Sequence, residues 1–253
     1  MSNLGCRAPC AGSRSTKHTQ AAMITTDRFV FLHLHKSGGT FVNECLLRFL
    51  PDARQIGYHL PRSMTPPEAA HLPVLGFVRN PWSYYVSWYA FQSERPNPNF
   101  LFRILSDDGN LDFENTIRNM LNLGAGSLRL DMVMRALPQK YSNQGLNLPG
   151  FALEPIRNTR LGFYSYLYRY LYTGAGKPVI VGRLEELRDE LLPMLESVGQ
   201  SVSDEMRSYV ENESPRNTSE HTAYTDYYSE GLRDLVAERD AEVITRHGYR
   251  FGG

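Results

Sequence analysis

A cationic, hydroxyl-bearing and glycine-rich run follows the first apolar segment of the chain. It reads Lys36-Ser37-Gly38-Gly39-Thr40 and stands between a predicted buried strand (Phe29–His35) and a predicted helix (Thr40–Leu50). A strand that enters a helix through glycines presents backbone N–H groups and the positive end of the helix dipole to an anion. The lysine adds a point charge and the two hydroxyls add donors. The run predicts a phosphate or sulfate site.

A second anion site is predicted after the next apolar segment, Val74–Val78. Arg79 follows this strand at its carboxyl end, the edge where open α/β sheets bind ligands. Asn80 is a plausible N-cap and Pro81 a first-turn residue of the next helix, Pro81–Gln92. Ser87 lies eight residues after the arginine. An arginine for a bidentate phosphate contact and a hydroxyl two helical turns on would form the second site.

The order of residues in the first run bears on its ligand. A nucleoside triphosphate loop places its lysine after the glycines, as GxxxxGK[ST], whereas Lys36 precedes them. This order disfavours a P-loop kinase of a small metabolite, which stays the main alternative. A glycine turn with an exposed lysine is the simplest reading of the run taken alone.

The two runs together resemble sulfotransferases, which use 3′-phosphoadenosine 5′-phosphosulfate (PAPS) as donor. Three segments carry the resemblance: HKSGGT resembles the family's 5′-phosphosulfate loop, VRNPWSYYVSWY its 3′-phosphate motif, and Tyr58-His59-Leu60-Pro61 the Thr-His-Leu-Pro segment that carries the catalytic histidine. His59 precedes Arg79 by 20 residues, similar to the family's spacing. The likeness covers residues 29–89 and 178–251.

The resemblance implies roles for individual residues. Lys36 would neutralise charge on the oxygen that bridges sulfate and 5′-phosphate, and His59 would take the acceptor's proton, with adenosine 3′,5′-bisphosphate (PAP) as product and no metal required. The donor would be held by Lys36, Ser37, Gly38, Gly39, Thr40, Arg79 and Ser87. The family's Arg-Lys-Gly clamp is missing, and Asn217 is its weak substitute. His35 and His71 remain alternative bases.

Strands alternating with helices predict a three-layer α/β fold, a P-loop-like central parallel sheet in a single domain. A third strand is expected at Pro178–Val181, a loop at Tyr141–Pro155, and further helices at Asp112–Leu123, Leu128–Leu137, Thr159–Tyr172, Leu184–Val198 and Ser229–His247. Residues 95–175 form a helical insert expected on the acceptor side. Phe100, Phe102, Tyr164 and Tyr168 are its candidate acceptor-wall residues, with a core role as the alternative.

Composition narrows the functional classes. The 253 residues are 42% hydrophobic and 21% charged, with 27 basic and 27 acidic side chains. A folded chain with zero formal net charge lacks the broad cationic field that nucleic-acid binding needs. No apolar run is long enough to span a membrane.

Localisation and partners follow from the same data. Three cysteines, at positions 6, 10 and 45, suit a reducing compartment, so a cytoplasmic protein is expected. Residues 1–22 are predicted to be a disordered tail, followed by the domain at 23–253. The expected acceptor is a small molecule or a carbohydrate. A non-catalytic PAPS-binding module is the alternative from another functional class, and the acceptor group and oligomeric state are left open.

Overall fold

The sheet at the centre of the molecule has five strands in the order β3-β1-β2-β4-β5. The computed structural model describes residues 23–143, 145–214 and 223–253. The strands are β1 Met23–Thr25, β2 Val30–Leu32, β3 Arg54–Gly57, β4 Val74–Val78 and β5 Val179–Arg183. β2, β4 and β5 are parallel, whereas β1 pairs antiparallel with both β2 and β3. The predicted α/β class is confirmed. The sheet is mixed because β1 and β3, which the sequence did not predict, extend it.

Alternation along the strands divides the core into two layers. Val30 and Leu32 belong to one buried cluster, and Phe31 between them belongs to the other. β4 repeats this pattern, with Val74 and Leu75 on opposite sides. Successive side chains of a strand point to opposite faces, so the two clusters are the two faces of one sheet. A strand covered on both faces has a continuous apolar sequence. The bounds of β4 could therefore be predicted from its apolar run, Val74–Val78.

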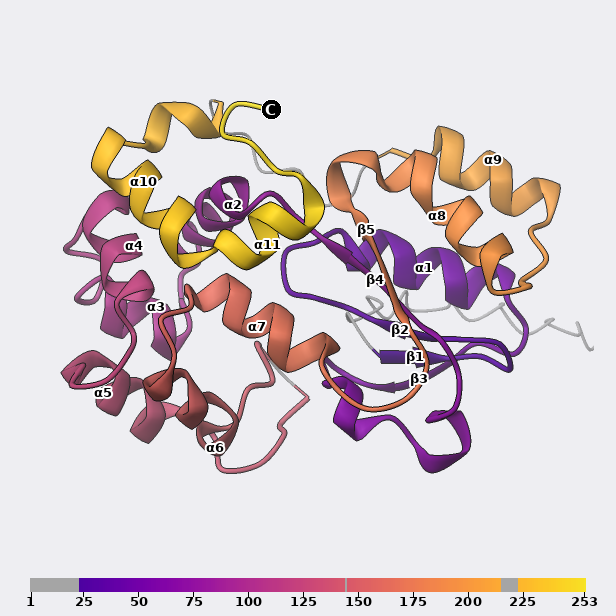
Figure 1. Cartoon of the computed structure of the whole chain (residues 1–253), viewed down its shortest axis with the longest axis horizontal. Helices are drawn as coiled ribbons and strands as arrows, with labels where there is room; N and C mark the ends of the chain where they lie inside the picture. Colours follow the sequence, from indigo (N-terminus) through magenta and orange to yellow (C-terminus); the bar gives the residue numbers. More distant parts are fainter. Residues whose placement is uncertain (1–22, 144, 215–222) are drawn as a thin grey trace, which may run out of the picture.

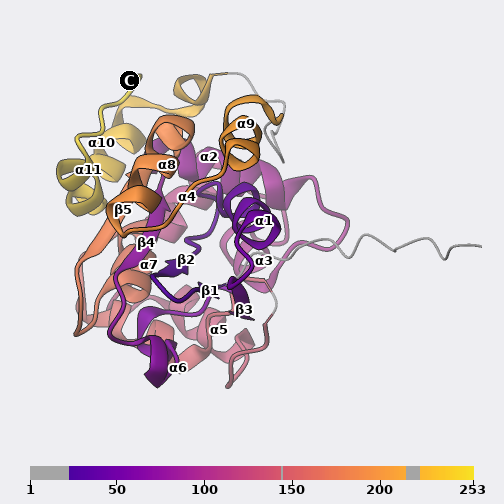
Figure 2. The same cartoon turned by 90° about the vertical axis from the view of Figure 1, so that its right-hand side faces the viewer.

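One face of the sheet is covered by three helices, α1 (Gly39–Phe49), α8 (Leu187–Ser197) and α9 (Asp204–Asn212). Figure 2 shows α1 and α9 on the near side of the sheet. A short turn of 3₁₀ helix, η4 (Leu184–Glu186), precedes α8. The N-cap Ser203 accepts a hydrogen bond from the Met206 N–H and begins α9. The sequence analysis did not predict α9.

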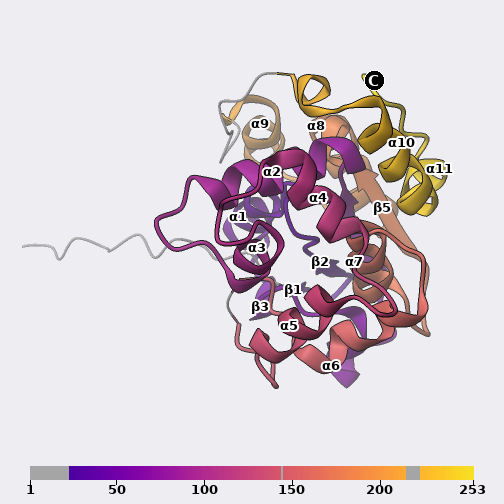
Figure 3. The same ribbon diagram turned by 90° about the vertical axis from the view of Figure 1, so that its left-hand side faces the viewer.

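The other face carries α2 (Pro81–Ser93), α7 (Phe163–Tyr172) and the helices of the insert (Figures 1 and 3). α7 crosses the sheet so closely that a Cβ on Gly76 would lie 2.3 Å from the Tyr172 hydroxyl. That hydroxyl donates to the Phe77 carbonyl at 3.1 Å. The insert contains α3 Phe100–Leu105, α4 Phe113–Leu121, α5 Leu128–Ala136, α6 Gly150–Leu153 and the 3₁₀ turn η3 Glu154–Asn158. The predicted loop at Tyr141–Pro155 therefore holds α6 and the start of η3.

The C-terminal segment forms two helices, α10 (Glu230–Arg239) and α11 (Ala241–His247), where one long helix was predicted. Asp240 separates them and is fully buried. Its carboxylate accepts hydrogen bonds from the Tyr85 hydroxyl at 2.7 Å and the Ser165 N–H at 2.8 Å. Asp240 therefore turns the chain and ties it to α2 and α7.

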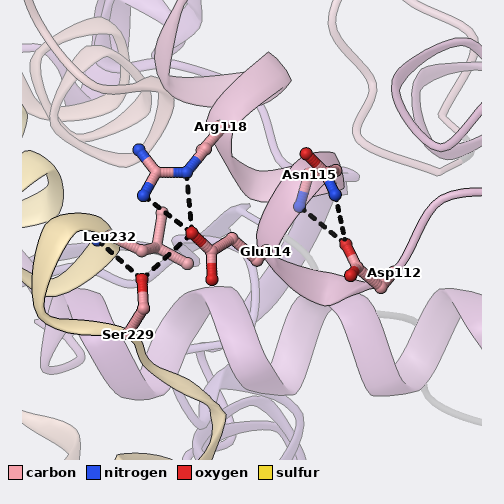
Figure 4. Close-up of polar contacts among 6 residues, drawn as sticks. All are labelled: Asp112, Glu114, Asn115, Arg118, Ser229 and Leu232. Atoms are coloured by element: carbon pink, nitrogen blue, oxygen red, sulfur yellow. Dashed lines mark hydrogen bonds and ion pairs between the residues drawn. The ribbon is translucent and has the colours of Figure 1, made fainter.

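Polar contacts join the insert to the C-terminal segment (Figure 4). The Glu114 carboxylate of α4 accepts two hydrogen bonds from Arg118, at 2.9 and 2.7 Å, and one from the Ser229 hydroxyl at 3.0 Å. Ser229 also caps α10 by accepting from the Leu232 N–H. One carboxylate thus fixes the start of α10 against α4. In the part of the chain that the structure describes, no helix is long and apolar enough to cross a membrane.

Candidate active site

The two predicted anion loops lie at one edge of the sheet. β2 and β4 are adjacent and parallel, with Leu32 opposite Gly76, so the segments that follow them leave the sheet side by side. The first loop enters α1 with Gly38 as N-cap, and the second enters α2 with Asn80 as N-cap. Neither helix has an acidic residue in its first turn. Two helix N-termini of this kind favour an anion at this edge.

Each loop carries one cation, Lys36 in the first and Arg79 in the second, and the Lys36 ammonium lies 4.2 Å from the centre of the Phe91 ring. Burial and, to a smaller extent, the positive charge of Arg79 lower the pKa of the Lys36 ammonium to about 8, while the Glu94 carboxylate opposes the shift. Burial also lowers the pKa of Arg79. The negative charge of the Glu185 carboxylate opposes this shift. Within residues 23–143, 145–214 and 223–253, neither cation has an ion pair with a carboxylate. Two desolvated like charges are costly unless a ligand neutralises them.

The backbone of the first loop is strained at its lysine. Lys36 has a φ of 61°, in the left-handed region. Most other non-glycine residues there, among those described, are Asp or Asn, which tolerate this conformation; the remaining one is His59 at 43°. Strain of about 1 to 3 kcal/mol per residue persists where the surroundings impose it, and it is concentrated at functional sites. The two strained residues are those to which the sequence assigned chemistry.

The two glycines of the loop have packing roles that the sequence did not reveal. A Cβ on Gly38 would lie 2.5 Å from the Leu184 side chain, and φ there is 76°. A Cβ on Gly39 would lie 2.0 Å from the His33 ring. The glycines were expected to let the backbone approach a ligand. In the structure they also let η4 and His33 approach the loop.

Tyr164 of α7 joins the two loops. Its hydroxyl accepts a hydrogen bond from the Arg79 N–H at 2.7 Å and lies 3.0 Å from Ser37 Oγ. Its ring stacks on Tyr84 with a centroid distance of 4.0 Å. Tyr164 was predicted to line the acceptor wall, but it is fully buried and contacts the donor loops instead. The Ser37 hydroxyl, expected to bind the ligand, is engaged with Tyr164 and lies 3.4 Å from the His35 carbonyl.

The side chain of Arg79 contacts a hydroxyl of α2. The guanidinium Nε donates to Ser83 Oγ at 2.9 Å. The predicted partner, Ser87, is buried one turn farther along α2. Ser83 was missed, although its position four residues after the arginine was a usable signal, because residues four apart share a helix face. Thr40 is half-buried in the first turn of α1. Asn217 lies outside the described residues.

His59 is held in one tautomer. Its Nδ1 lies 2.8 Å from the His33 carbonyl oxygen, which can only accept, so Nδ1 carries the proton and Nε2 keeps its lone pair. Burial lowers the pKa of His59 to about 4, while the bond to His33 opposes that shift. The imidazole is therefore neutral near pH 7, with a basic nitrogen available.

Two further histidines surround His59. The ring centroids of His33 and His35 lie 4.6 and 5.5 Å from that of His59. Nδ1 of each is buried without a hydrogen-bond partner among the described residues. Burial lowers the pKa of both rings, and the positive charge of Lys36 contributes at His35. His71, the other alternative base, is exposed and precedes β4, at the opposite end of that strand from Arg79.

A small recess lies beside the histidines, with a cavity volume of about 20 Å³. It is lined by the three imidazoles and by the apolar side chains Leu34, Leu146, Leu148, Leu167, Tyr170 and Leu171. Most of these apolar residues belong to the insert. The predicted wall residues do not line it: Phe102 packs against Trp88 and Tyr89, Tyr168 packs against Tyr172, and Phe100 is exposed. Their role in acceptor binding stays a prediction.

The described residues contain no group of three or more His, Cys, Asp or Glu side chains placed to hold a metal ion. Comparisons with known proteins give likenesses in structure but none in sequence. No family model and no curated protein matches the sequence. The chain is similar in structure to the mouse sulfotransferase SULT7A1 complexed with PAP. The TM-score is 0.44 and the identity 14%, over 86% of this chain and 85% of that one. A likeness this distant carries no argument about activity, which must come from the chain's own residues.

The strain at Lys36 predicts an inverted order of stability for two variants. Lys36→Gly is expected to be about 1 kcal/mol more stable than Lys36→Ala, because only glycine adopts a φ of 61° without steric cost. Urea unfolding measures the difference. The control pair Lys140→Gly and Lys140→Ala, at an exposed residue without positive φ, should not show this order. Equal stability of the two Lys36 variants would contradict the strain.

The buried imidazole of His59 predicts a loss of stability in acid. The pKa of His59 is about 4 in the fold against about 6.5 in the unfolded chain, so only the unfolded chain takes up this proton between those values. Its contribution is fully present above pH 6.5 and falls by about 3 kcal/mol as the pH drops to 4. The measurement is the difference in unfolding free energy between wild type and His59→Gln. Other titratable groups, such as Asp240, whose pKa is raised to about 6, contribute equally to both proteins, so their pH dependence cancels in this difference. A pH-independent difference would refute the prediction.

Proposed function

We propose that the protein is a sulfotransferase that moves the sulfuryl group of PAPS to a hydroxyl, or an amine, of a small-molecule acceptor and releases PAP. The observation that carries the proposal is that two neighbouring helix N-termini each carry a cation, Lys36 and Arg79. They are desolvated cations without a carboxylate ion pair in the described chain, at two neighbouring helix N-termini. A ligand with two separate anionic groups satisfies both cations.

The donor's two anionic ends are assigned to the two loops. Lys36 and the backbone at the start of α1 would bind the 5′-phosphosulfate, and Lys36 would neutralise charge on the leaving phosphate oxygen. Arg79, with Ser83 and Ser87 on the same side of α2, would bind the 3′-phosphate. Gly38, Gly39 and Thr40 remain assigned to the first loop, and Asn217 remains a weaker candidate for the nucleotide. Ser37 acts through Tyr164, by fixing the two loops relative to each other.

His59 is assigned as the general base. The acceptor oxygen attacks sulfur as the bond from sulfur to the bridging oxygen breaks, and Nε2 of His59 takes the acceptor's proton. The hydrogen bond from Nδ1–H to the His33 carbonyl supports this role, because it leaves Nε2 unprotonated and orients the ring. The imidazolium formed is destabilised by burial, which favours return of the proton to solvent after transfer.

The lining of the small recess beside His59 supports an acceptor whose reacting end carries neutral, apolar groups. Its walls are leucines, a tyrosine and imidazoles held neutral by burial, with no lysine or arginine among them. A polyanionic sugar chain would find no counter-charge there, so a small molecule fits better than a glycan. The insert would then set acceptor choice. A cytoplasmic location is proposed from the low cysteine content, with Cys45 a free buried thiol.

The donor assignment is tested by thermal stabilisation. PAP is expected to raise the melting temperature by several degrees, whereas ADP and ATP at equal concentration do little, because PAP reaches both anion loops. Arg79→Ala should weaken the binding of PAP by about 2 to 4 kcal/mol, measured by calorimetry, because a charge-assisted phosphate contact is lost. Arg103→Ala, at an exposed surface arginine, is the control. An equal shift with ATP, or unchanged PAP affinity in Arg79→Ala, would defeat the assignment.

The chemical role of His59 is tested by turnover with PAPS and a panel of neutral phenols and aliphatic alcohols. His59→Gln is expected to lower kcat at least ~100-fold and to leave PAP affinity nearly unchanged, because a general base acts in the transition state. His71→Gln, at an exposed histidine beyond the other end of β4, is the matched control and should keep full activity. Retained turnover in His59→Gln would move the role to His35. PAP binding without turnover on any acceptor would favour the non-catalytic module.

A further inference from the structure

A second cavity lies at the opposite edge of the sheet, near the starts of β4 and β5. Its cavity volume is about 190 Å³. Its walls come from the 3₁₀ turns after β3, η1 (Arg62–Met64) and η2 (Pro67–Ala69), and from the connection between α7 and β5. Figure 1 shows these two segments side by side, the first in purple and the second in orange. The length of β4 separates this cavity from Arg79.

The charged residue of this cavity is Arg62. Its side chain is buried, with 9% of the residue exposed. The guanidinium donates to the Gly174 carbonyl at 3.2 Å and to the Lys177 carbonyl, but it makes no ion pair with a carboxylate in the described part of the chain. The guanidinium has five N–H donors, so these two carbonyls leave donors over. A buried cation whose partners are neutral carries a charge that an anion would compensate.

A second polar group marks the same wall. Thr65 Oγ1 is buried and has no hydrogen-bond partner among the described residues, although Thr65 lines the cavity. A hydroxyl buried without a partner costs about 1 to 3 kcal/mol, so a rotation of the Thr65 side chain that turned Oγ1 towards a ligand oxygen in the cavity would recover that energy. The hydroxyl and the guanidinium belong to one turn, because the Thr65 N–H donates to the Arg62 carbonyl at 3.0 Å. Ser63 adds a further polar side chain to the lining.

The rest of the cavity is apolar. Its lining continues with Ala69, Leu72, Val74 and Ala175. One cation beside one hydroxyl matches a single carboxylate group, and small apolar side chains leave room for a hydrocarbon tail. A multiply charged phosphate or nucleotide would find one cation and an apolar floor, which disfavours both. The nearby acid of the same segment, Glu68, is exposed on η2 and does not line the cavity.

We propose that this cavity is a binding site for a small organic carboxylate with an apolar tail, its carboxylate on Arg62 and Thr65 and its tail against Leu72 and Val74. The site is separate from the one that binds the anions of the proposed reaction. A ligand here would hold the connection into β5 against the segment that carries His59, because Arg62 already links the two. The proposal stands independently of the proposed function.

The test uses ligand-observed NMR on the full chain, with hexanoate, 1-hexanol and inorganic phosphate as separate probes. Hexanoate is expected to show saturation transfer and to persist when PAP is added in excess, whereas 1-hexanol and phosphate show little. Displacement of hexanoate by PAP would overturn the proposal by assigning the signal to the other edge of the sheet. Equal signals from hexanoate and 1-hexanol would also overturn it, because the charge would then play no part.

Two variants test the position without removing the hydrogen bonds of Arg62. Thr65→Val keeps the shape of the side chain and loses its hydroxyl. It should weaken the binding of hexanoate about 10-fold. Ala175→Leu adds bulk to the cavity wall and should abolish binding. Ala136→Leu, at the end of α5, is the control for added bulk. Melting temperatures establish that each variant is folded. Full hexanoate affinity in a folded Ala175→Leu would refute the site.

Discussion

The hydroxyl of Tyr164 is the contact on which the geometry of the candidate active site depends. It lies between the loop that follows β2 and the loop that follows β4, and it hydrogen-bonds to both. Burial raises its pKa, so the hydroxyl keeps its proton and can accept from Arg79 while it donates to Ser37. Each loop is fixed at its strand end, and this link fixes the separation between them. Two anion sites set at one separation can select a ligand whose anionic groups match it.

The support for Tyr164 comes from segments distant in sequence. Its N–H donates to the Tyr85 hydroxyl at 3.3 Å, and that hydroxyl donates to the buried Asp240 carboxylate. Asp240 also leaves no room for a side chain at Gly162, where a Cβ would lie 2.5 Å from it. The start of α7 is thus held by a carboxylate of the C-terminal segment. The Tyr164 and Ser165 N–H groups, the Tyr85 hydroxyl and the Asp240 carboxylate are all paired in this network, which favours one arrangement.

Sequence alone predicted the parts of the fold that local chemistry decides. β4 has its predicted bounds because both its faces are buried, and α2 begins at Pro81 because Asn80 caps it, accepting from the Trp82 N–H. β3 was missed because Arg54, Gln55 and Ile56 are exposed at the sheet edge and show no apolar run. The break at Asp240 was missed because a buried carboxylate with its partners on other helices leaves no local signal.

The same division holds at the site. Lys36, His59 and Arg79 could be named from local motifs, since each lies beside a strand end with recognisable neighbours. The sequence identified Tyr164 as an aromatic residue of the insert, but it could not predict its contacts, because its partners lie 127 and 85 positions away. The same distance in sequence concealed the leucines of the recess beside His59. Tertiary contacts of this range are set by packing, and hydrophobic periodicity does not encode them.

The residues assigned to chemistry lower the stability of the fold, and other parts of the molecule must offset that loss. The desolvated charge of Lys36 and the left-handed backbone at Lys36 and His59 lower stability. The same charge favours binding of an anion, and the neutral imidazole of His59 can accept a proton. Apolar packing elsewhere offsets that cost, since both faces of the sheet are covered by continuous clusters. The insert contributes to one of these clusters and also lines the recess. Its leucines can therefore change the shape of the recess while the donor loops, fixed by β2, β4 and Tyr164, stay in place.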